Sequence, residues 1–547
     1  FLLVGLFPLS FLLSCSKELE LEPQNSLMSQ KQREETAKEL PDRVDALLDG
    51  MYAELKRIFR TSGTAHNDIG LTSVTLMLDQ STDNMWSEDL GYNWFGSPQS
   101  YTSNTPNTLL ANYTYRNFYA YVKAANDVLN YTSETSTDSL VLATRAQARA
   151  FRAWAYLNLV QIYQLPYQGH EDDPAVPLVN EKTTTEQCYN NPRRSVAEVY
   201  DYIVSELEAA KEVLAKGDAS VLHTDIDEFV VRGFLARAYL IMGKNTEAAE
   251  EARYVIDNSG RFPYSLEEAS YPNFYNVKDH NVLWGMGVTP IDRCATTGIL
   301  NWQSFMTFLG SNSTYAQYVP RNINPALYHS MKKNDVRRAW WMTITQNAEK
   351  KWVVNLLGLV NMFVHNGYTP EGAKAAALQF VEDRQLIGRT YAGIKFGPEN
   401  GDINSEDNSA DFPIMRIEEM YYIEAEAKQD KALLEDFVKT YREPGYTVDA
   451  YQPASLTDEI YRQRRIEFWG EGLSYFDMLR LKKGMVRSDT KAIEDALKLS
   501  FYPEKSRFDI APESPAFIMV FPRREVLQNK ALVQNPLPSE TDYQIPF

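Results

Sequence analysis

The sequence predicts a mainly α-helical protein in which a scaffold of helical repeats carries an irregular, loop-rich region. Apolar residues recur at helical spacing in 41–60, 107–260 and 411–484, which are the predicted scaffold segments. Alanine is frequent among these apolar positions, and small side chains let neighbouring helices approach closely. In 61–106 and 261–410, glycine, proline, asparagine and aromatic residues mix with only short periodic runs, which predicts loops.

Length and composition fit a large globular domain. The chain has 547 residues, of which 44% are hydrophobic, 12% aromatic and 23% charged, as in ordinary folded proteins. We expect one domain over 41–547, with 485–547 as its C-terminal part. Acidic residues outnumber basic ones by 73 to 55, and the formal charge is −18. Because phosphate binding needs a basic surface and no Lys/Arg-rich run occurs, nucleic acid is not an expected partner.

The first 40 residues are predicted to be a signal segment followed by a tether. Residues 1–14 are almost wholly apolar and end at Cys15, and such a run is too short to span a bilayer but fits the core of a signal peptide. Since the chain opens at Phe1 without a methionine or a basic leader, we expect the precursor to begin upstream. Residues 15–40 are polar and form the predicted tether. An ordinary cleaved signal or a buried helix is the alternative interpretation of the apolar run.

The residues around Cys15 resemble a bacterial lipoprotein signal. LLSC (12–15) is similar to a lipobox, in which the cysteine is acylated and becomes the mature N-terminus, although Leu13 stands where a smaller residue is commoner. SKELE (16–20) resembles the acidic tag that sends Bacteroidetes lipoproteins to the cell surface. The resemblance implies that Cys15 is lipidated and that the protein is anchored in the outer membrane, facing outward.

The scaffold helices are predicted in chain order. The first begins at Pro41-Asp42, and others follow over 108–130, 138–164 and 195–216, the last with Ser195 as its N-cap. The segment 225–258 places six residues where a tetratricopeptide unit packs its two helices. These residues are Leu235, Ala236, Tyr239, Ala248, Ala252 and Val255. Helices 138–164 and 195–216 look like another such pair, separated by an insertion.

The stretch 457–484 carries many charges among aromatic residues. It is predicted to be the second helix of a last repeat pair, with 411–430 as the first. Glu467 and Glu471 lie one helical turn apart, and Asp477 follows less than two turns later. Two carboxylates beside arginines could form an acid/base pair or an ion network that ties helices together. We favour the network, because long charged side chains are rarely buried unless they are paired.

Several separated stretches resemble the SusD/RagB family of Bacteroidetes outer-membrane lipoproteins. The lipobox with its acidic tag is the first of them, and the later ones follow in family order along nearly the whole chain. They are AANDVL (124–129), 148–163 with Leu165-Pro166, RNINPALYHSMKKNDVRR (321–338), DFPIMRIEEMYYIEAEA (411–427), RRIEFWGEGLSYFDMLR (464–480) and Phe521-Pro522 with Glu525 and QNP (534–536). Phe521-Pro522 departs from the Ile-Pro that is commoner in the family.

The resemblance implies a helical-repeat scaffold with a ligand-facing, irregular subdomain. Family members cap a TonB-dependent porin of the SusC type and pass captured glycans or peptides into it, without chemical transformation. The expected partners are therefore such a porin, a glycan ligand and the outer membrane. A peptide or glycopeptide ligand is one alternative, and a tetratricopeptide scaffold that binds only protein is another.

No pattern of a catalytic, cofactor or metal site stands out. The six histidines show no HExxH or HxH spacing, and neither a GxSxG elbow nor a GxxxxGK[ST] loop occurs. DINSE (402–406) resembles half of a calcium loop, but Asp407 and Pro413 occupy the positions where glycine and glutamate are needed. We expect no enzyme activity, cofactor or metal. Cys188 and Cys294 lie far apart in sequence, and a disulfide between them stays open.

Two loop stretches are the candidate ligand site. Sugar rings stack on aromatic side chains, while amides, carboxylates and arginines hydrogen-bond the hydroxyl groups. Both kinds of residue occur near 83–94 and near 301–321, roughly where family members place their ligand loops. The candidate residues are Asp83, Asn84, Trp86, Tyr92, Trp94, Asn301, Trp302, Tyr315, Tyr318 and Arg321. For any one of these aromatics, packing in the core is the alternative, and Trp154 and Trp469 are assigned to the core.

Overall fold

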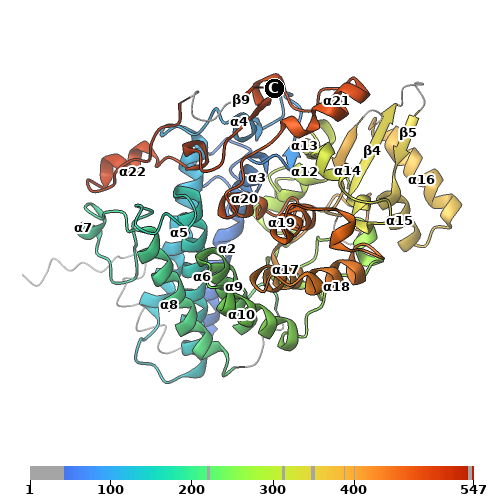
Figure 1. Ribbon diagram of the computed structural model, residues 1–547. Coiled ribbons are helices and arrows are strands. Elements are labelled where there is room, and N and C mark those ends of the chain that lie inside the picture. The colour runs from blue at the N-terminus through green and yellow to red at the C-terminus, as the bar shows by residue number, and fades with distance from the viewer. Residues whose placement is uncertain are drawn as a thin grey trace, which may run out of the picture.

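The computed structural model describes residues 42–217, 222–310, 314–346, 352–386, 389–398, 401–539 and 545–546. Cys15 and the predicted tether lie outside this part of the chain. The described residues form a mainly helical fold, as the sequence predicts (Figure 1). None of their helices is long and apolar enough to cross a membrane.

A continuous stack of helices forms the scaffold. Each helix packs on the next in the order α5, α6, α8, α9, α10, α17 and α18, with α2 against α5 and α6, and α19 against α17 (Figure 1). The bounds of these helices and of α20 are α2 Asp42–Ala53, α5 Leu109–Tyr131, α6 Ser139–Tyr163, α8 Val196–Leu214, α9 Glu228–Met242, α10 Asn245–Asn258, α17 Ile417–Ala427, α18 Lys431–Tyr441, α19 Leu456–Glu467 and α20 Ser474–Arg480.

Small residues and caps explain these helices. Ala148, Ala150 and Ala153 of α6 are fully buried, so the neighbouring helices approach its backbone closely. Helix α8 begins at a capping box, in which the Ser195 hydroxyl accepts from the backbone N–H of Glu198 and the Glu198 carboxylate accepts from that of Ser195. The predicted N-cap is thus confirmed.

The irregular region contains a small sheet that sequence periodicity did not reveal. Its strands are antiparallel in the order β1-β3-β6-β4-β5, and β4, β5, α15 and α16 lie together on the right of Figure 1. Because β1 and β3 have two residues each, they leave no alternating pattern to detect. The strand bounds are β1 Met85–Trp86, β2 Val282–Met286, β3 Asn322–Ile323, β4 Trp341–Gln346, β5 Trp352–Asn355, β6 Thr390–Gly393, β7 Phe412–Arg416, β8 Phe508–Asp509 and β9 Ile545–Pro546.

Short helices connect these elements. The α-helices are α3 Leu71–Gln80, α4 Gly96–Ser100, α7 Thr185–Cys188, α11 Arg293–Thr296, α12 Trp302–Met306, α13 Thr314–Tyr318, α14 Pro325–His329, α15 Leu357–His365, α16 Pro370–Asp383, α21 Lys491–Leu497 and α22 Arg523–Gln528. The 3₁₀ helices are Glu54–Lys56, Glu268–Ser270, Val336–Trp340, Val448–Ala450, Ser488–Thr490, Glu504–Ser506 and Pro515–Phe517.

The charged stretch 457–484 forms two helices, not the single helix predicted. Between α19 and α20 the chain turns at Gly470 (φ 83°) and Gly472 (φ 76°), a backbone conformation that favours glycine. Gly472 lies close to α3, where its N–H donates to Asp79 at 3.0 Å. The break therefore lets the stretch pack against the N-terminal half of the chain.

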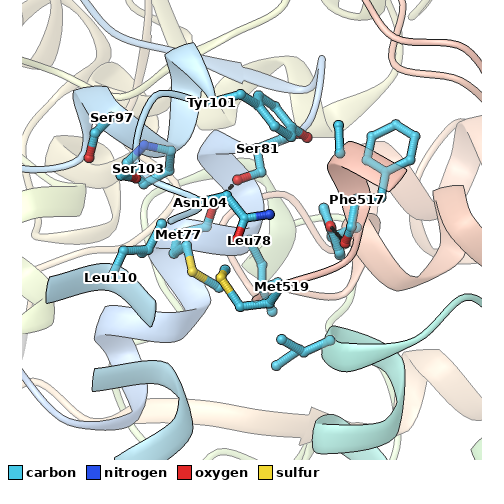
Figure 2. A pocket seen from close by; sticks show the side chains of 14 residues that line it. Met77, Leu78, Ser81, Ser97, Tyr101, Ser103, Asn104, Leu110, Phe517 and Met519 are labelled. Atoms are coloured by element: carbon cyan, nitrogen blue, oxygen red, sulfur yellow. Dashed lines mark hydrogen bonds between the residues drawn. The ribbon is translucent and has the colours of Figure 1, made fainter. Parts of the chain in front are cut away.

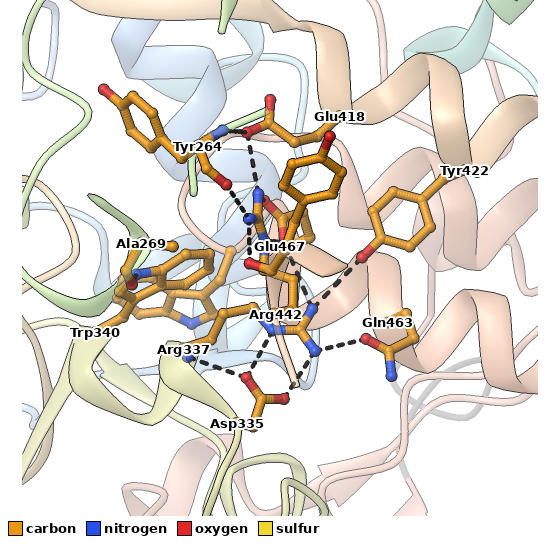
Figure 3. A network of polar contacts seen from close by, with 12 residues as sticks. Tyr264, Ala269, Asp335, Arg337, Trp340, Glu418, Tyr422, Arg442, Gln463 and Glu467 are labelled. Atoms are coloured by element: carbon orange, nitrogen blue, oxygen red, sulfur yellow. Dashed lines mark hydrogen bonds and ion pairs between the residues drawn. The ribbon is translucent and has the colours of Figure 1, made fainter. Parts of the chain in front are cut away.

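The carboxylates of this stretch form a buried ion network (Figure 3). Arg442 donates from Nε and Nη2 to the two oxygens of Glu467 at 2.7 and 2.9 Å, and Arg416 Nη1 lies 3.1 Å from the same carboxylate. Arg416 also binds Glu471, which accepts from Lys395. Burial alone would raise the pKa of Glu467, but the charges of Arg442 and Arg416 outweigh it and hold that pKa well below its usual range. The network interpretation is thus confirmed, and these carboxylates are not presented to solvent.

The two cysteines in the described chain are free thiols. Cys188 is half-buried at the end of α7, and Cys294 is buried in α11. No disulfide joins them in this structure.

Candidate functional site

The two predicted loop stretches meet in a cluster of aromatic side chains. Tyr92 lies 5.5 Å from Tyr318 and 6.5 Å from Tyr315 between ring centres. His66 stacks on Trp94 at 5.0 Å and meets Tyr315 edge-on at 6.0 Å. We call these five residues the aromatic platform. Tyr92, Tyr318 and Trp94 are 58%, 51% and 36% exposed, so three of its rings face solvent.

Buried rings and hydrogen bonds hold the platform in place. Phe305 of α12 stacks on Tyr315 at 4.6 Å with nearly parallel planes, and Phe95 packs edge-on against Phe305. The Asn67 amide donates to the carbonyl of Trp94 at 3.0 Å. The Tyr315 hydroxyl is hydrogen-bonded to Nδ1 of His66. The exposed rings thus rest on a packed layer, which keeps them oriented before any ligand arrives.

Polar groups surround the rings. Arg389 pairs with Glu88 at 2.9 Å and donates to the carbonyl of Tyr318 at 3.2 Å. Asn93, between the two aromatic residues of its loop, donates to the carbonyl of Glu88 at 3.0 Å and accepts from Arg321. Rings flanked by amide, carboxylate and guanidinium groups are the combination that sugar hydroxyls and pyranose faces require.

Three of the ten candidate residues, Asp83, Asn84 and Trp86, lie in the core. Asp83 is paired with Arg465 at 3.0 Å, and the side-chain oxygen of Asn84 accepts from Nε of the same arginine. Trp86 belongs to β1, donates to the carbonyl of Ile323 and is 4% exposed. These contacts give all three side chains a structural role.

Three further candidates are also buried. The Asn301 side chain caps α12 by accepting from the backbone N–H of Ser304 at 2.8 Å. Trp302, at the start of α12, packs against Phe412 and is 4% exposed. Arg321 is 1% exposed, and its guanidinium lies against Asn93 and Phe95. Of the predicted site residues, therefore, the structure brings Tyr92, Trp94, Tyr315 and Tyr318 together, with Tyr92, Trp94 and Tyr318 exposed and Tyr315 buried among them.

Three residues at the platform were missed by sequence reasoning. His66, Glu88 and Arg389 lie in loops and belong to no motif. His66 meets a tyrosine 249 positions away, and Arg389 meets a glutamate 301 positions away. Only the loop composition around them could have indicated a site.

Among the described residues, no group of three or more His, Cys, Asp or Glu side chains is placed to hold a metal ion. A cavity of about 30 Å³ lies in the core between α3, the loop after α4 and 516–519 (Figure 2). It is lined mainly by apolar side chains, among them Met77, Leu78 and Phe517, and none of its lining residues belongs to the platform. Its volume is that of about one water molecule, so it cannot take a sugar.

Comparison with known proteins identifies the family. The family model described as "Starch-binding associating with outer membrane" matches residues 19–240, and the model of the SusD family matches residues 310–537. A relative from Formosa agariphila, SusD-like protein P2, is 32% identical over 170 residues. That match spans 31% of this chain and only 30% of the relative's length.

Solved structures show the same fold. A SusD-like carbohydrate binding protein from Bacteroides vulgatus is 19% identical, with a TM-score of 0.68, and the match covers 92% of this chain and 98% of that one. A SusD superfamily protein from Bacteroides thetaiotaomicron gives 19% identity, a TM-score of 0.65 and coverage of 91% and 100%. A laminarin binding SusD-like protein gives 16% identity, a TM-score of 0.54 and coverage of 90% and 99%. The family models at both ends of the chain and the shared fold agree with the motifs, and the chain belongs to the SusD/RagB family.

Proposed function

We propose that this protein is a cell-surface lipoprotein that binds oligosaccharides or polysaccharides on the aromatic platform and delivers them to a SusC-like TonB-dependent porin. The observation that carries the proposal is the convergence of Tyr92, Trp94 and Tyr318, three exposed rings on a packed support. Exposed aromatics gathered from distant segments have no role in the core, whereas pyranose rings stack on such faces.

The proposed role is binding without chemical transformation. Glu467 and Glu471, the carboxylates that resembled an acid/base pair, are buried and held in ion pairs with arginines. A glycosidase needs two carboxyl groups facing its substrate across a cleft. At the platform, the carboxylate of Glu88 is already paired with Arg389. These arrangements support capture of a ligand and not its hydrolysis.

Replacing Trp94 and Tyr318 together by alanine tests the binding site. We expect glycan affinity to fall about 10- to 100-fold, since each ring contributes about 0.5–1.5 kcal/mol beyond its buried area. The melting temperature should stay within about 2 °C of the wild type, because both rings are exposed. Affinity electrophoresis against starch, laminarin and other soluble polysaccharides finds the ligand, and calorimetry measures the loss.

Tyr189→Ala is the matched control for this pair. Tyr189 is 55% exposed, close to the value for Tyr318, but it lies beside α7 and outside the platform. It should leave glycan affinity unchanged. Full affinity in the double variant would reject the platform as the glycan site. Binding of peptides instead of any glycan would favour the alternative ligand class, which tyrosine rings also suit.

Replacing Cys15 by alanine tests the lipid anchor. Acyl chains hold a protein on a membrane by about 0.8 kcal/mol for each buried CH₂ group, so their loss should move the protein from the membrane to the soluble fraction. The measurement is fractionation of cells that lack the porin partner, followed by immunoblotting. Retention in the membrane fraction under those conditions would contradict anchoring at Cys15.

A further inference from the structure

Arg321 is a buried arginine that makes one side-chain hydrogen bond with the described residues. Its Nη1 donates to the amide oxygen of Asn93 at 3.1 Å, and its guanidinium carbon lies 5.8 Å from the centre of the Phe95 ring. Nε and Nη2 have no hydrogen-bond partner among the described residues. Burial lowers the pKa of this guanidinium to about 9, and no neighbouring carboxylate offsets that effect.

Nε and Nη2 lie on one edge of the guanidinium, and other arginines of this protein bind carboxylates with that edge. Arg237 donates from Nε and Nη2 to the two oxygens of Glu419 at 2.8 and 2.5 Å. Arg416 does the same to Glu471 at 3.0 and 2.8 Å. This side-on geometry matches the two oxygens of a planar carboxylate. Arg321 presents the same edge without an oxygen on it.

Other buried arginines that lack a carboxylate still donate to several backbone oxygens, although Nε of Arg487 has no partner among the described residues. Arg487 donates from Nη1 to the carbonyls of Gln99 and Ser506 at 2.7 and 3.0 Å. Arg145 donates to the carbonyls of Leu129 and Thr132. An unpaired buried charge is among the most costly features of a folded protein. The presence of such a charge at Arg321 therefore points to a partner that binds from outside the folded chain.

The position of Arg321 points to the ligand as that partner. Its one hydrogen-bond acceptor in the described part of the chain, Asn93, is half-buried and in the sequence follows Tyr92 and precedes Trp94, two rings of the platform. The guanidinium also lies against Phe95, the next residue of the same loop. Arg389, the other arginine beside the platform, already pairs with the carboxylate of Glu88 at 2.9 Å.

We propose that Arg321 is a specificity-determining residue that receives the carboxylate of an acidic oligosaccharide, one containing hexuronate residues. The inference rests on the proposed glycan-binding function and adds the ligand's chemical class. In the free protein Nη1 of Arg321 donates to the Asn93 amide oxygen, and the Asn93 amide nitrogen donates to the Ser87 hydroxyl and the Glu88 carbonyl. When a uronate ring stacks on the platform, Asn93 gives up these bonds and rotates away, and the carboxylate takes the Nε–Nη2 edge. A neutral sugar offers hydroxyl groups but no countercharge, and it binds less tightly.

The test compares acidic oligosaccharides with their carboxyl-reduced, neutral forms. The probes are tetramers of galacturonate, mannuronate and glucuronate, each titrated calorimetrically in both forms into the wild type, Arg321→Gln, Arg321→Lys and Asn93→Ala. We expect the wild type to prefer one acidic form at least tenfold. Arg321→Gln should bind both forms with equal affinity, Arg321→Lys should keep part of the preference, and Asn93→Ala should keep all of it.

A purely structural role for Arg321 predicts a different result. Arg321→Gln would then lower the melting temperature and leave the acidic-to-neutral ratio unchanged, which would overturn the inference. Equal wild-type affinity within every pair, or no binding to any of them, would also overturn it. Binding of neutral glycans in those cases would leave the proposed function standing. Tighter binding of peptides with a free terminal carboxylate, with no glycan bound, would reject both.

Discussion

Replacing Glu467 by glutamine should destabilise the protein by about 3–5 kcal/mol, the usual effect of removing one partner from a buried ion pair. The side chain of Glu467 is fully buried and joins Arg337, Arg416 and Arg442. Glutamine keeps the shape but removes the charge, so three buried guanidinium groups lose their shared counter-ion. Urea denaturation followed by tryptophan fluorescence measures the change in the free energy of unfolding.

Asp127→Asn is the control for this variant. Asp127 forms an exposed pair with Lys123 at 2.5 Å on α5, and such surface pairs contribute about 0.5 kcal/mol or less. A loss of similar size in both variants would mean that the buried network contributes no more than a surface pair.

The pH dependence of Glu467→Gln provides a second check. The folded-state pKa of Glu467 is depressed below its ordinary value of 4.5. The carboxylate therefore stabilises the fold fully above pH 4.5, and this contribution is lost as the pH falls toward the depressed pKa. We expect the difference in stability between wild type and variant to shrink over that acid range.

Replacing Trp302 by alanine should also cost about 3–5 kcal/mol, the range for a large buried aromatic. Trp302 packs between Phe396 and Phe412, with ring centres at 5.5 and 4.6 Å, and is 4% exposed. The same substitution at Trp94, which is 36% exposed, is the matched control and should lower glycan affinity while leaving stability nearly unchanged. Comparing the two Trp→Ala variants thus distinguishes an effect on core packing from an effect on glycan binding.

The opposite result for Trp302→Ala, unchanged stability with lost glycan affinity, would place Trp302 in the ligand site. If Trp302→Ala kept its free energy of unfolding and lost glycan affinity, the indole would have to contact the ligand. The sequence prediction placed both tryptophans there, since each lies in a loop stretch beside amide residues.

Much of the fold was accessible from the sequence because helices leave a local signal. The apolar period and alanine positions of 225–258 predicted α9 and α10, and Ser195 marked the start of α8. The family motifs are linear runs of residues, so they too were readable without a structure. The five-stranded sheet was not predicted, because its strands are short and come from segments far apart in the chain.

The candidate site was only partly predictable. Loop composition pointed to Tyr92, Trp94 and Tyr318, which are exposed, and equally to Trp86 and Trp302, which are buried. Nothing local distinguishes these cases, because burial depends on which other segment packs over a side chain.

By itself, the sequence determined the family, the helical scaffold and the residues from which a ligand surface could be built. The tertiary structure decided which of those residues face solvent, joined two distant loops into the aromatic platform, and left one edge of Arg321 without a partner among the described residues. The reason is physical. Helical period and sequence motifs are local properties of a chain, whereas exposure and charge pairing depend on contacts between residues hundreds of positions apart.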